Sequence, residues 1–298
     1  MPIVRTPDER FENLPGFPFS PRYVEIDGMR VHYVDEGRGE IILCLHGVPT
    51  WSFLYRKVIP LLAVKYRVIA MDFIGFGRSD KFTDAGDYSF QLHHDTLVKF
   101  ITTLGLDRIT LVGLDGGADY GLWAAMEMPE RISRLVIMNT DLPTGLQPTN
   151  TMFEMWRKFV QLEPDIPIEI VLRAAARRGY EYPAETIAAY TAPFPDKASK
   201  VGAAAWALMA PTRPGDQAAP MVRQARDALG RWSKPAIAIF SEDDPIYAGA
   251  QRIFRELIPT VKEQPNVVIQ RAGHFLMEEQ GDEVVRQIEG FLGRTSAR

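Results

Sequence analysis

Short, almost fully apolar runs recur along the chain, separated by longer segments with helical periodicity. An apolar strand without alternation is buried on both faces, as in a parallel sheet covered by helices. The runs lie at Ile41–Leu45, Arg67–Met71, Ile109–Leu114, Leu135–Asn139, Pro235–Phe240 and Asn266–Gln270. Ahead of them, Tyr23–Ile26 and Arg30–Asp35 are typical of a hairpin that turns at Asp27 and Gly28.

Segments of helical length fill the intervals between these runs. They include His94–Leu104, Ala118–Met128 and Ala248–Leu257, and Asp282–Leu292 carries apolar residues at helical spacing. Strands that alternate with helices predict an α/β fold with a mostly parallel, doubly wound sheet. With 298 residues, the chain is long enough for one such domain with an inserted subdomain.

Residues 146–220 break the alternation of strands and helices. They are helical in pattern, contain no convincing buried strand and are interrupted repeatedly by proline. We therefore predict a helical cap at residues 146–220, inserted into a core formed by residues 1–145 and 221–298.

Charge and composition exclude several classes of protein. The net charge is −4 and no basic run stands out, so we expect no nucleic-acid partner and no anionic membrane partner. No apolar stretch reaches the roughly 18 residues that a membrane span requires. The first residues contain no apolar signal region and the only cysteine, Cys44, lies in an apolar run, which favours a cytoplasmic protein with a buried thiol.

The segment Gly113-Leu114-Asp115-Gly116-Gly117 follows an apolar strand and opens a helix. This is the pattern of a nucleophile elbow, with Asp in the place where Ser is commoner. The glycines permit a tight turn, and the helix N-terminus favours the ionised carboxylate. A carboxylate can form a covalent ester, so Asp115 is the candidate nucleophile. An aspartate that only caps the helix is the alternative interpretation.

A second candidate segment, His46-Gly47-Val48-Pro49-Thr50-Trp51, follows the strand that ends at Leu45. Next to a nucleophile elbow, such a loop supplies one backbone N–H of an oxyanion hole, and the residue after the nucleophile supplies the other. Here these donors would belong to Val48 and Gly116. The alternative is a His-Gly turn with purely local hydrogen bonds.

The third and fourth candidates follow later strands. His274 lies in Gly273-His274-Phe275 and would act as a general base on water. Asp244 precedes Pro245 and would orient His274 and stabilise its charged form. Asp141, after the preceding strand, competes for that role, and we favour Asp244. The chain order nucleophile, acid, histidine is that of an α/β-hydrolase fold.

Five longer segments carry a resemblance to a known family: His46–Arg56, Asp72–Lys81, Asn139–Gly145 (Asn-Thr-Asp-Leu-Pro-Thr-Gly), Tyr190–Asp196 (Tyr-Thr-Ala-Pro-Phe-Pro-Asp) and Ala272–Phe275. Over nearly the whole chain the sequence resembles the haloalkane dehalogenases, specifically the branch whose acid follows the later strand. Several of the segments are shared with epoxide hydrolases, whereas 139–145 and 190–196 are more specific to the dehalogenases.

The resemblance implies a two-step hydrolysis of a small apolar substrate. The aspartate displaces halide from an sp3 carbon, and a water activated by histidine then cleaves the resulting ester. No metal or organic cofactor is implied.

Two positions depart from the family pattern. Members usually carry Trp after the nucleophile, where its indole N–H holds the halide, and Glu or Asn in the loop; here these positions are Gly116 and Val48. The cap Trp that completes the halide pair aligns near Arg178. Because a departing halide needs donors in an apolar pocket, these changes indicate a dehalogenase that is weak or acts on an altered substrate.

Other interpretations stay open at this point. Epoxide opening would need hydroxyl donors, which Tyr180, Tyr182 and Tyr190 of the cap could provide. A non-catalytic paralogue would keep the fold without turnover, although Asp115, His274 and Asp244 together argue against it. We also expect Trp51, Arg178 and Tyr180 to line the substrate pocket.

Overall fold

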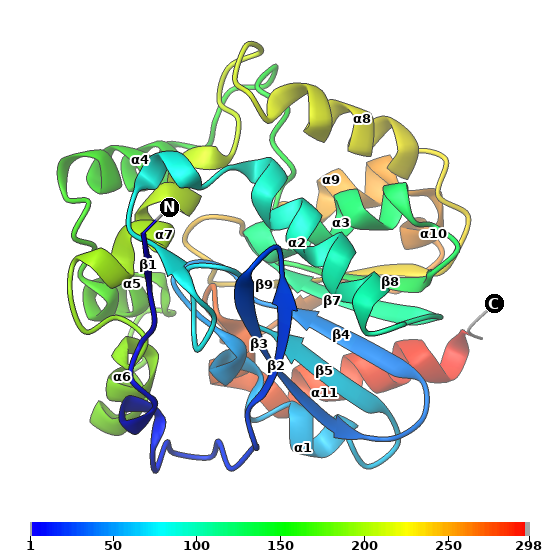
Figure 1. Ribbon diagram of the computed structural model, residues 1–298. Helices are drawn as coiled ribbons and strands as arrows, with labels where there is room; N and C mark the ends of the chain where they lie inside the picture. Colours follow the sequence, from blue (N-terminus) through cyan, green and yellow to red (C-terminus); the bar gives the residue numbers. More distant parts are fainter. Residues whose placement is uncertain (1, 296–298) are drawn as a thin grey trace.

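The computed structural model describes residues 2–295, and its main feature is an eight-stranded sheet in the order β10-β9-β8-β7-β4-β5-β3-β2 (Figure 1). All neighbours from β10 to β5 pair in parallel, whereas β5 with β3 and β3 with β2 pair antiparallel. The strands are β2 (Arg22–Ile26), β3 (Met29–Gly37), β4 (Ile41–Leu45), β5 (Arg67–Met71), β7 (Ile109–Leu114), β8 (Ile132–Met138), β9 (Ala236–Ser241) and β10 (Val267–Ile269). The predicted mostly parallel α/β sheet is therefore confirmed.

Helices cover both faces of this sheet (Figure 1). On one face lie α1 (Ile59–Leu62) and α11 (Leu276–Arg294), which contact each other. On the other face, α3 (Gly116–Glu127) packs between α2 (Phe90–Thr103) and α8 (Ala219–Leu229). Two short helices, α9 (Gln251–Leu257) and α10 (Pro259–Lys262), pack against β9. Because helices cover both faces, every residue of β7 is buried, as its almost fully apolar sequence predicted.

Comparison of the predicted and observed strand ends shows where the sequence pattern was sufficient to place them. The strands at Ile41–Leu45, Arg67–Met71 and Ile109–Leu114 begin and end as predicted. The strand expected from residue 135 begins instead at residue 132, because the charged Arg134 is buried within it. Its guanidinium donates to Glu40 at 2.9 Å and to the Thr295 carbonyl at 2.7 Å. Polar periodicity alone cannot reveal a buried, fully paired arginine.

The starts of two helices were predicted too late. The helix expected from residue 94 is α2, which begins at Phe90 because the Ser89 hydroxyl caps it by accepting from the Leu92 N–H. The last helix, α11, begins at Leu276 rather than at residue 282, and contains a non-helical residue at Gln280. That interruption hides the first helical turn from a periodicity argument.

Residues 139–235, all described, contain no strand and form the helical insert between β8 and β9. Figure 1 shows its first helices grouped at the left of the view, beside one end of the sheet. They are α4 (Thr151–Leu162), α5 (Ile168–Ala175), α6 (Ala184–Thr191) and α7 (Val201–Met209). The helical character of the insert agrees with the sequence, whereas the domain limits at residues 146 and 220 stay a prediction. Within residues 2–295, no helix is both long enough and apolar enough to cross a membrane.

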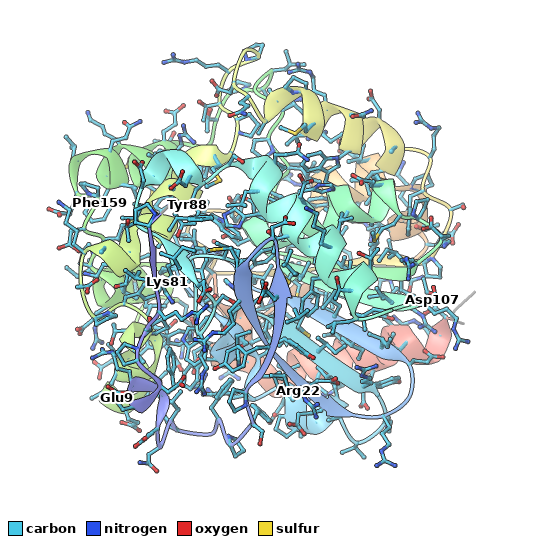
Figure 2. All side chains as sticks on the ribbon, in the orientation of Figure 1. Glu9, Arg22, Lys81, Tyr88, Asp107 and Phe159 are labelled. Carbon is cyan, nitrogen blue, oxygen red and sulfur yellow. The ribbon has the colours of Figure 1, made fainter. Side chains whose placement is uncertain are left out.

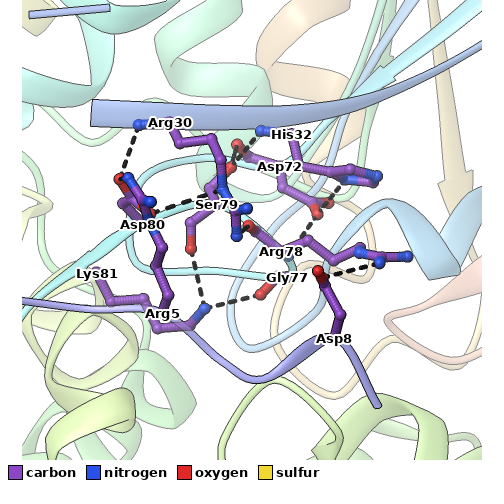
Figure 3. Close-up of polar contacts among 10 residues, drawn as sticks. All are labelled: Arg5, Asp8, Arg30, His32, Asp72, Gly77, Arg78, Ser79, Asp80 and Lys81. Atoms are coloured by element: carbon purple, nitrogen blue, oxygen red, sulfur yellow. Dashed lines mark hydrogen bonds and ion pairs between the residues drawn. The ribbon is translucent and has the colours of Figure 1, made fainter. Parts of the chain in front are cut away.

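The loop after β5 is fixed by the buried carboxylate of Asp72 (Figure 3). Its Oδ1 accepts from the Ser52 N–H at 2.7 Å, and its Oδ2 accepts from the Arg78 N–H at 2.9 Å and contacts His32 Nδ1 at 2.7 Å. Burial alone would raise the pKa of Asp72, but His32 and the other donors lower it below its ordinary value. One ion therefore ties this loop to β3 and to the segment that begins at Ser52.

Lys81 closes the same loop from inside the protein. In Figure 2 it lies well within the outline of the molecule, whereas Glu9 and Asp107 lie near the edge. Its Nζ donates to the carbonyls of Gly77 at 2.7 Å and Ser79 at 3.0 Å, and burial lowers its pKa to about 7 (Figure 3). Lys81 also begins β6 (Lys81–Phe82), which pairs with β1 (Ile3–Val4) in a small antiparallel sheet that the sequence did not predict.

Replacing Asp72 by alanine should lower the free energy of unfolding by roughly 3–5 kcal/mol, because the change leaves buried donors without an acceptor. Urea unfolding of both proteins measures the difference. Asp84→Ala is the matched control: the Asp84 carboxylate is exposed and accepts only from the Gly86 N–H. Its loss should cost about 1 kcal/mol. Equal losses in the two variants would contradict the role assigned to Asp72.

Candidate active site

Asp115 lies on the turn that joins β7 to α3. Its φ of 53° and ψ of −141° are rare for a residue with a side chain, and such strain persists only where the surroundings impose it. The turn packs closely against the loop after β4, because a Cβ at Gly117 would overlap the carbonyl oxygen of His46. The glycine after Gly116 is therefore a steric requirement of the elbow, and it presents the Asp115 side chain at the end of the sheet.

The Asp115 carboxylate is held from two sides. The Val48 N–H donates to Oδ2 at 3.0 Å, and the Gly116 backbone is a second hydrogen-bonding group. Nε2 of His274 lies 3.8 Å from Oδ1. Burial raises the pKa of Asp115, and the histidine and the backbone groups offset only part of this effect. The two backbone donors are those that the sequence suggested for an oxyanion hole.

His274 is buried beside a second carboxylate. Its Nδ1 lies 2.9 Å from Oδ2 of Asp244, while Oδ1 of Asp244 accepts from the N–H groups of Ile246 and Tyr247. Burial by itself lowers the pKa of His274, but the charges of Asp244 and Asp115 outweigh it and raise the pKa above the ordinary 6.5. The arrangement can take a proton at Nε2 and stabilise the resulting imidazolium.

A cavity of about 310 Å³ opens above these residues. Asp115, His274 and the cap lie together on it, because the loops after β4, β7 and β10 meet helices α4, α5 and α7 there. Met155 and Ile170 line the cavity although they are about 60% exposed, so they mark its mouth. Most other lining side chains are apolar: Val48, Phe90, Met152, Phe153, Trp156, Phe159, Val171, Trp206, Ile246 and Phe275.

Comparison with known proteins agrees with this geometry. A family model described as the alpha/beta hydrolase fold matches residues 40–280. A haloalkane dehalogenase of Mycobacterium marinum is 43% identical over 97% of this chain and 99% of its own length. One of Psychrobacter cryohalolentis is 40% identical, with 98% of each chain covered. The tetrameric structure of haloalkane dehalogenase DpaA from Paraglaciecola agarilytica NO2 superposes with a TM-score of 0.88 at 35% identity, covering 96% of this chain and 97% of that one.

The chain belongs to the haloalkane dehalogenase family. It is a haloalkane dehalogenase-like hydrolase with the α/β-hydrolase fold, as the resemblance implied.

Three residues that we expected to line the pocket of this dehalogenase-like hydrolase lie elsewhere. Trp51 is fully buried among Phe11, Phe17 and Phe53, and its Nε1 donates to a cap carbonyl at 3.2 Å. Arg178 is exposed on the loop after α5. Tyr180 packs against Tyr182, and its hydroxyl contacts the Glu278 carbonyl at 3.5 Å. None of the three is among the residues that line the cavity.

The cap tyrosines considered for epoxide opening are likewise turned away from the nucleophile. The Tyr190 hydroxyl donates to Glu278 at 2.8 Å, inside a buried ion pair of Glu278 with Arg56. The Tyr182 ring packs edge-on against Tyr180 and Tyr190. None of these three tyrosines is among the lining residues; the tyrosines on the cavity are Tyr120 and Tyr247.

Asn139 is a site residue to which we assigned no role from the sequence. It directly follows β8, has a positive φ of 37° and exchanges hydrogen bonds with Ser241, at the end of β9. The same amide donates to the His274 carbonyl at 2.7 Å. Asn139 thus fixes the histidine loop against the sheet. Its place directly after a buried strand was the available signal.

Two further carboxyl groups lie near Asp115. Asp119 lines the cavity one turn along α3, is buried, and accepts from the Thr140 hydroxyl at 2.7 Å. Burial and the nearby Asp141 raise the pKa of Asp119 well above its ordinary value. Burial and Asp115 raise the pKa of Asp141 to about 7. His274 Nδ1 contacts Asp244 rather than Asp141.

Asp119→Asn should change how stability depends on pH. A carboxyl whose pKa is raised in the folded state keeps its proton where the unfolded chain loses it, so its contribution falls as pH rises above the ordinary value of 3.8. The variant should therefore gain stability over the native protein as pH increases, in urea unfolding followed across the pH range. Asp107→Asn, on an exposed turn, controls for the lost charge. A difference that is constant with pH would contradict the raised pKa.

Proposed function

We propose that this dehalogenase-family hydrolase converts small apolar alkyl halides to alcohols through a covalent ester on Asp115. The observation that carries the proposal is the carboxylate itself: it is held on a strained turn, in an apolar cavity, with a histidine–carboxylate pair beside it. Nothing in this arrangement requires a group from outside the chain.

In the first step, Asp115 attacks the sp3 carbon that bears the halogen. Oδ2 is held by the Val48 N–H, which leaves Oδ1 as the attacking atom. A carbon–oxygen bond forms, and the carbon–halogen bond breaks with its electron pair leaving on the halide. The apolar wall removes water from the carboxylate and suits an alkyl chain, so the substrate is expected to be a small haloalkane.

In the second step, His274 Nε2 takes a proton from water, whose oxygen attacks the ester carbonyl of Asp115. Negative charge develops on the oxygen that faces the N–H groups of Val48 and Gly116. Asp244 stabilises the imidazolium meanwhile. Collapse breaks the bond between the carbonyl carbon and the alkoxy oxygen, the proton passes to the alcohol, and the carboxylate returns. The balance is alkyl halide and water to alcohol, halide and one proton.

Asp115→Ala should abolish halide release from brominated and chlorinated alkanes, because the attacking oxygen is lost. His274→Gln is the informative partner variant: it should release one halide per active site and then stop, with the alkyl group retained on Asp115, as mass spectrometry of the protein would show. Halide turnover that survives in Asp115→Ala would refute the proposal. Diol formation from epoxides without halide release from alkanes would move the activity to the related hydrolase class.

Ester hydrolysis should rise with pH as His274 loses its proton, because the base must be neutral to accept a proton from water, and the pKa of His274 sets the midpoint of that rise. Since Asp115 is uncharged in the ester, Asp244 is the anion that holds this pKa up. Asp244→Asn should slow hydrolysis and move the rise to lower pH. Single-turnover decay of the ester, followed against pH in both proteins, measures this. A rise at the same pH in both would exclude Asp244 as the partner.

A further inference from the structure

In the proposed first step, negative charge develops on the halide that leaves into the cavity. None of the hydrogen-bond donors described so far is directed at that halide. The N–H groups of Val48 and Gly116 serve the carboxylate of Asp115, so they do not serve the leaving group. A halide that departs into an apolar pocket requires a donor already aimed at the place where its charge develops. The remaining side chains on the cavity are mostly apolar.

The indole of Trp206, on α7, lies directly over the residue that follows the nucleophile. A Cβ built at Gly116 would overlap Nε1 of Trp206 and would lie 2.9 Å from its Cε2. Trp206 lines the same cavity as Asp115 and is 4% exposed. The nitrogen edge of the ring therefore occupies the space into which a side chain at position 116 would project. Gly116 is a condition for this placement.

Aromatic rings hold the indole in one orientation. Phe76, Phe73 and Tyr120 meet it edge-on, with ring centroids 4.9, 5.1 and 4.7 Å away, and His46 stacks on it at 6.2 Å with an interplanar angle of 19°. Such packing fixes the direction of the N–H before any ligand arrives, which is the condition for effective stabilisation of a developing charge.

Nε1 of Trp206 has no acceptor among residues 2–295. Elsewhere in the chain, Nε1 of Trp51 donates to the Ala189 carbonyl, whereas that of Trp232 is sealed in the protein without a partner and away from the cavity. Trp206 and Trp156 both line the cavity with an Nε1 that has no acceptor among residues 2–295, and of the two it is Nε1 of Trp206 that lies against Gly116, beside Asp115.

We propose that Trp206 donates its indole N–H to the departing halide and that Gly116 exists to admit it. The inference rests on the proposed function and deepens it, because it moves the halide donor that the resemblance places directly after Asp115 to a helix of the insert. It also gives a physical reason for the glycine at the position where the resemblance implies a tryptophan. The indole of a tryptophan at position 116 and the indole of Trp206 could not occupy this space together.

Trp206→Phe keeps an aromatic ring and removes the N–H. The alkylation step in single turnover should slow by about 10²–10³-fold, most for chlorides, while hydrolysis of the ester already formed should change little. The matched control is Trp232→Phe, which removes an equally unpaired N–H outside the cavity and should leave both steps unchanged. An alkylation rate within about twofold of the native protein would overturn the assignment, as would an equal loss in both steps.

Gly116→Ala tests the same idea from the other side. The φ of Gly116 lies outside the left-handed region, so alanine does not strain the backbone, but its Cβ must displace the indole. The alkylation rate should fall as in Trp206→Phe, and the double variant should be no worse than either single change. Additive losses would show that the two residues act separately.

Halide binding to the protein without substrate tests this inference independently of the proposed function. Bromide and iodide should quench tryptophan fluorescence at a saturable site in the native protein and in Trp232→Phe, and should lose that site in Trp206→Phe. Unchanged binding in Trp206→Phe would overturn the inference even if haloalkanes are turned over. A protein that binds halide through Trp206 but releases none from any haloalkane would instead refute the proposed function alone.

Discussion

The buried carboxylate of Asp72 is the constraint on which the rest of the site depends. It joins three segments that are far apart in sequence, through His32 on β3, the Ser52 N–H and the Arg78 N–H. The next residue, Phe73, donates its N–H to His46 Nε2 at 3.1 Å. The carboxylate therefore fixes the loop after β5 and, through it, the histidine that precedes the oxyanion loop. A single fully paired ion is an effective anchor here because an unpaired one would be very costly.

Aromatic contacts connect the loop that Asp72 fixes to the cavity. Phe73 and Phe76 belong to the anchored loop, and His46 to the loop after β4; all three rings touch Trp206. The position of an indole in the insert is therefore set by polar contacts in the core. On the other side of the cavity, Asn139 fixes the carbonyl of His274, and neither Asn139 nor these three rings are among the residues that line the cavity.

How much of this could be predicted from sequence depended on whether the signal was local. Uniformly apolar strands and the nucleophile pattern are local, and the strands at residues 41–45, 67–71 and 109–114 began and ended as predicted. The strand containing Arg134 began earlier than predicted, because its burial depends on Glu40 and Thr295, which are remote in sequence. Side chains of the cap were harder still. The path of a loop depends on the elements it packs against, so Arg178 and Tyr180, which lie between α5 and α6, could not be separated from true lining residues.

Trp206 shows the converse case, in which a residue that lines the cavity could not be distinguished from a packing residue by sequence. In an alanine-rich helix an isolated tryptophan is typical of a packing residue, and its contacts with several rings are indeed those of a core side chain. The role proposed for it depends on the absence of a side chain at Gly116, which lies against the indole on the same cavity and is remote from Trp206 in sequence.

The insert is consequently part of the catalytic geometry rather than a cover placed over it. The His274 N–H donates to the Ala175 carbonyl of α5 at 2.8 Å, and Trp51 and Glu278 of the core bind the Ala189 carbonyl and the Tyr190 hydroxyl of α6. Each of these contacts is buried, so opening the insert away from the sheet would expose or orphan several polar groups together. Substrate entry through the mouth beside Met155 and Ile170 avoids that cost, because those side chains are already in contact with solvent.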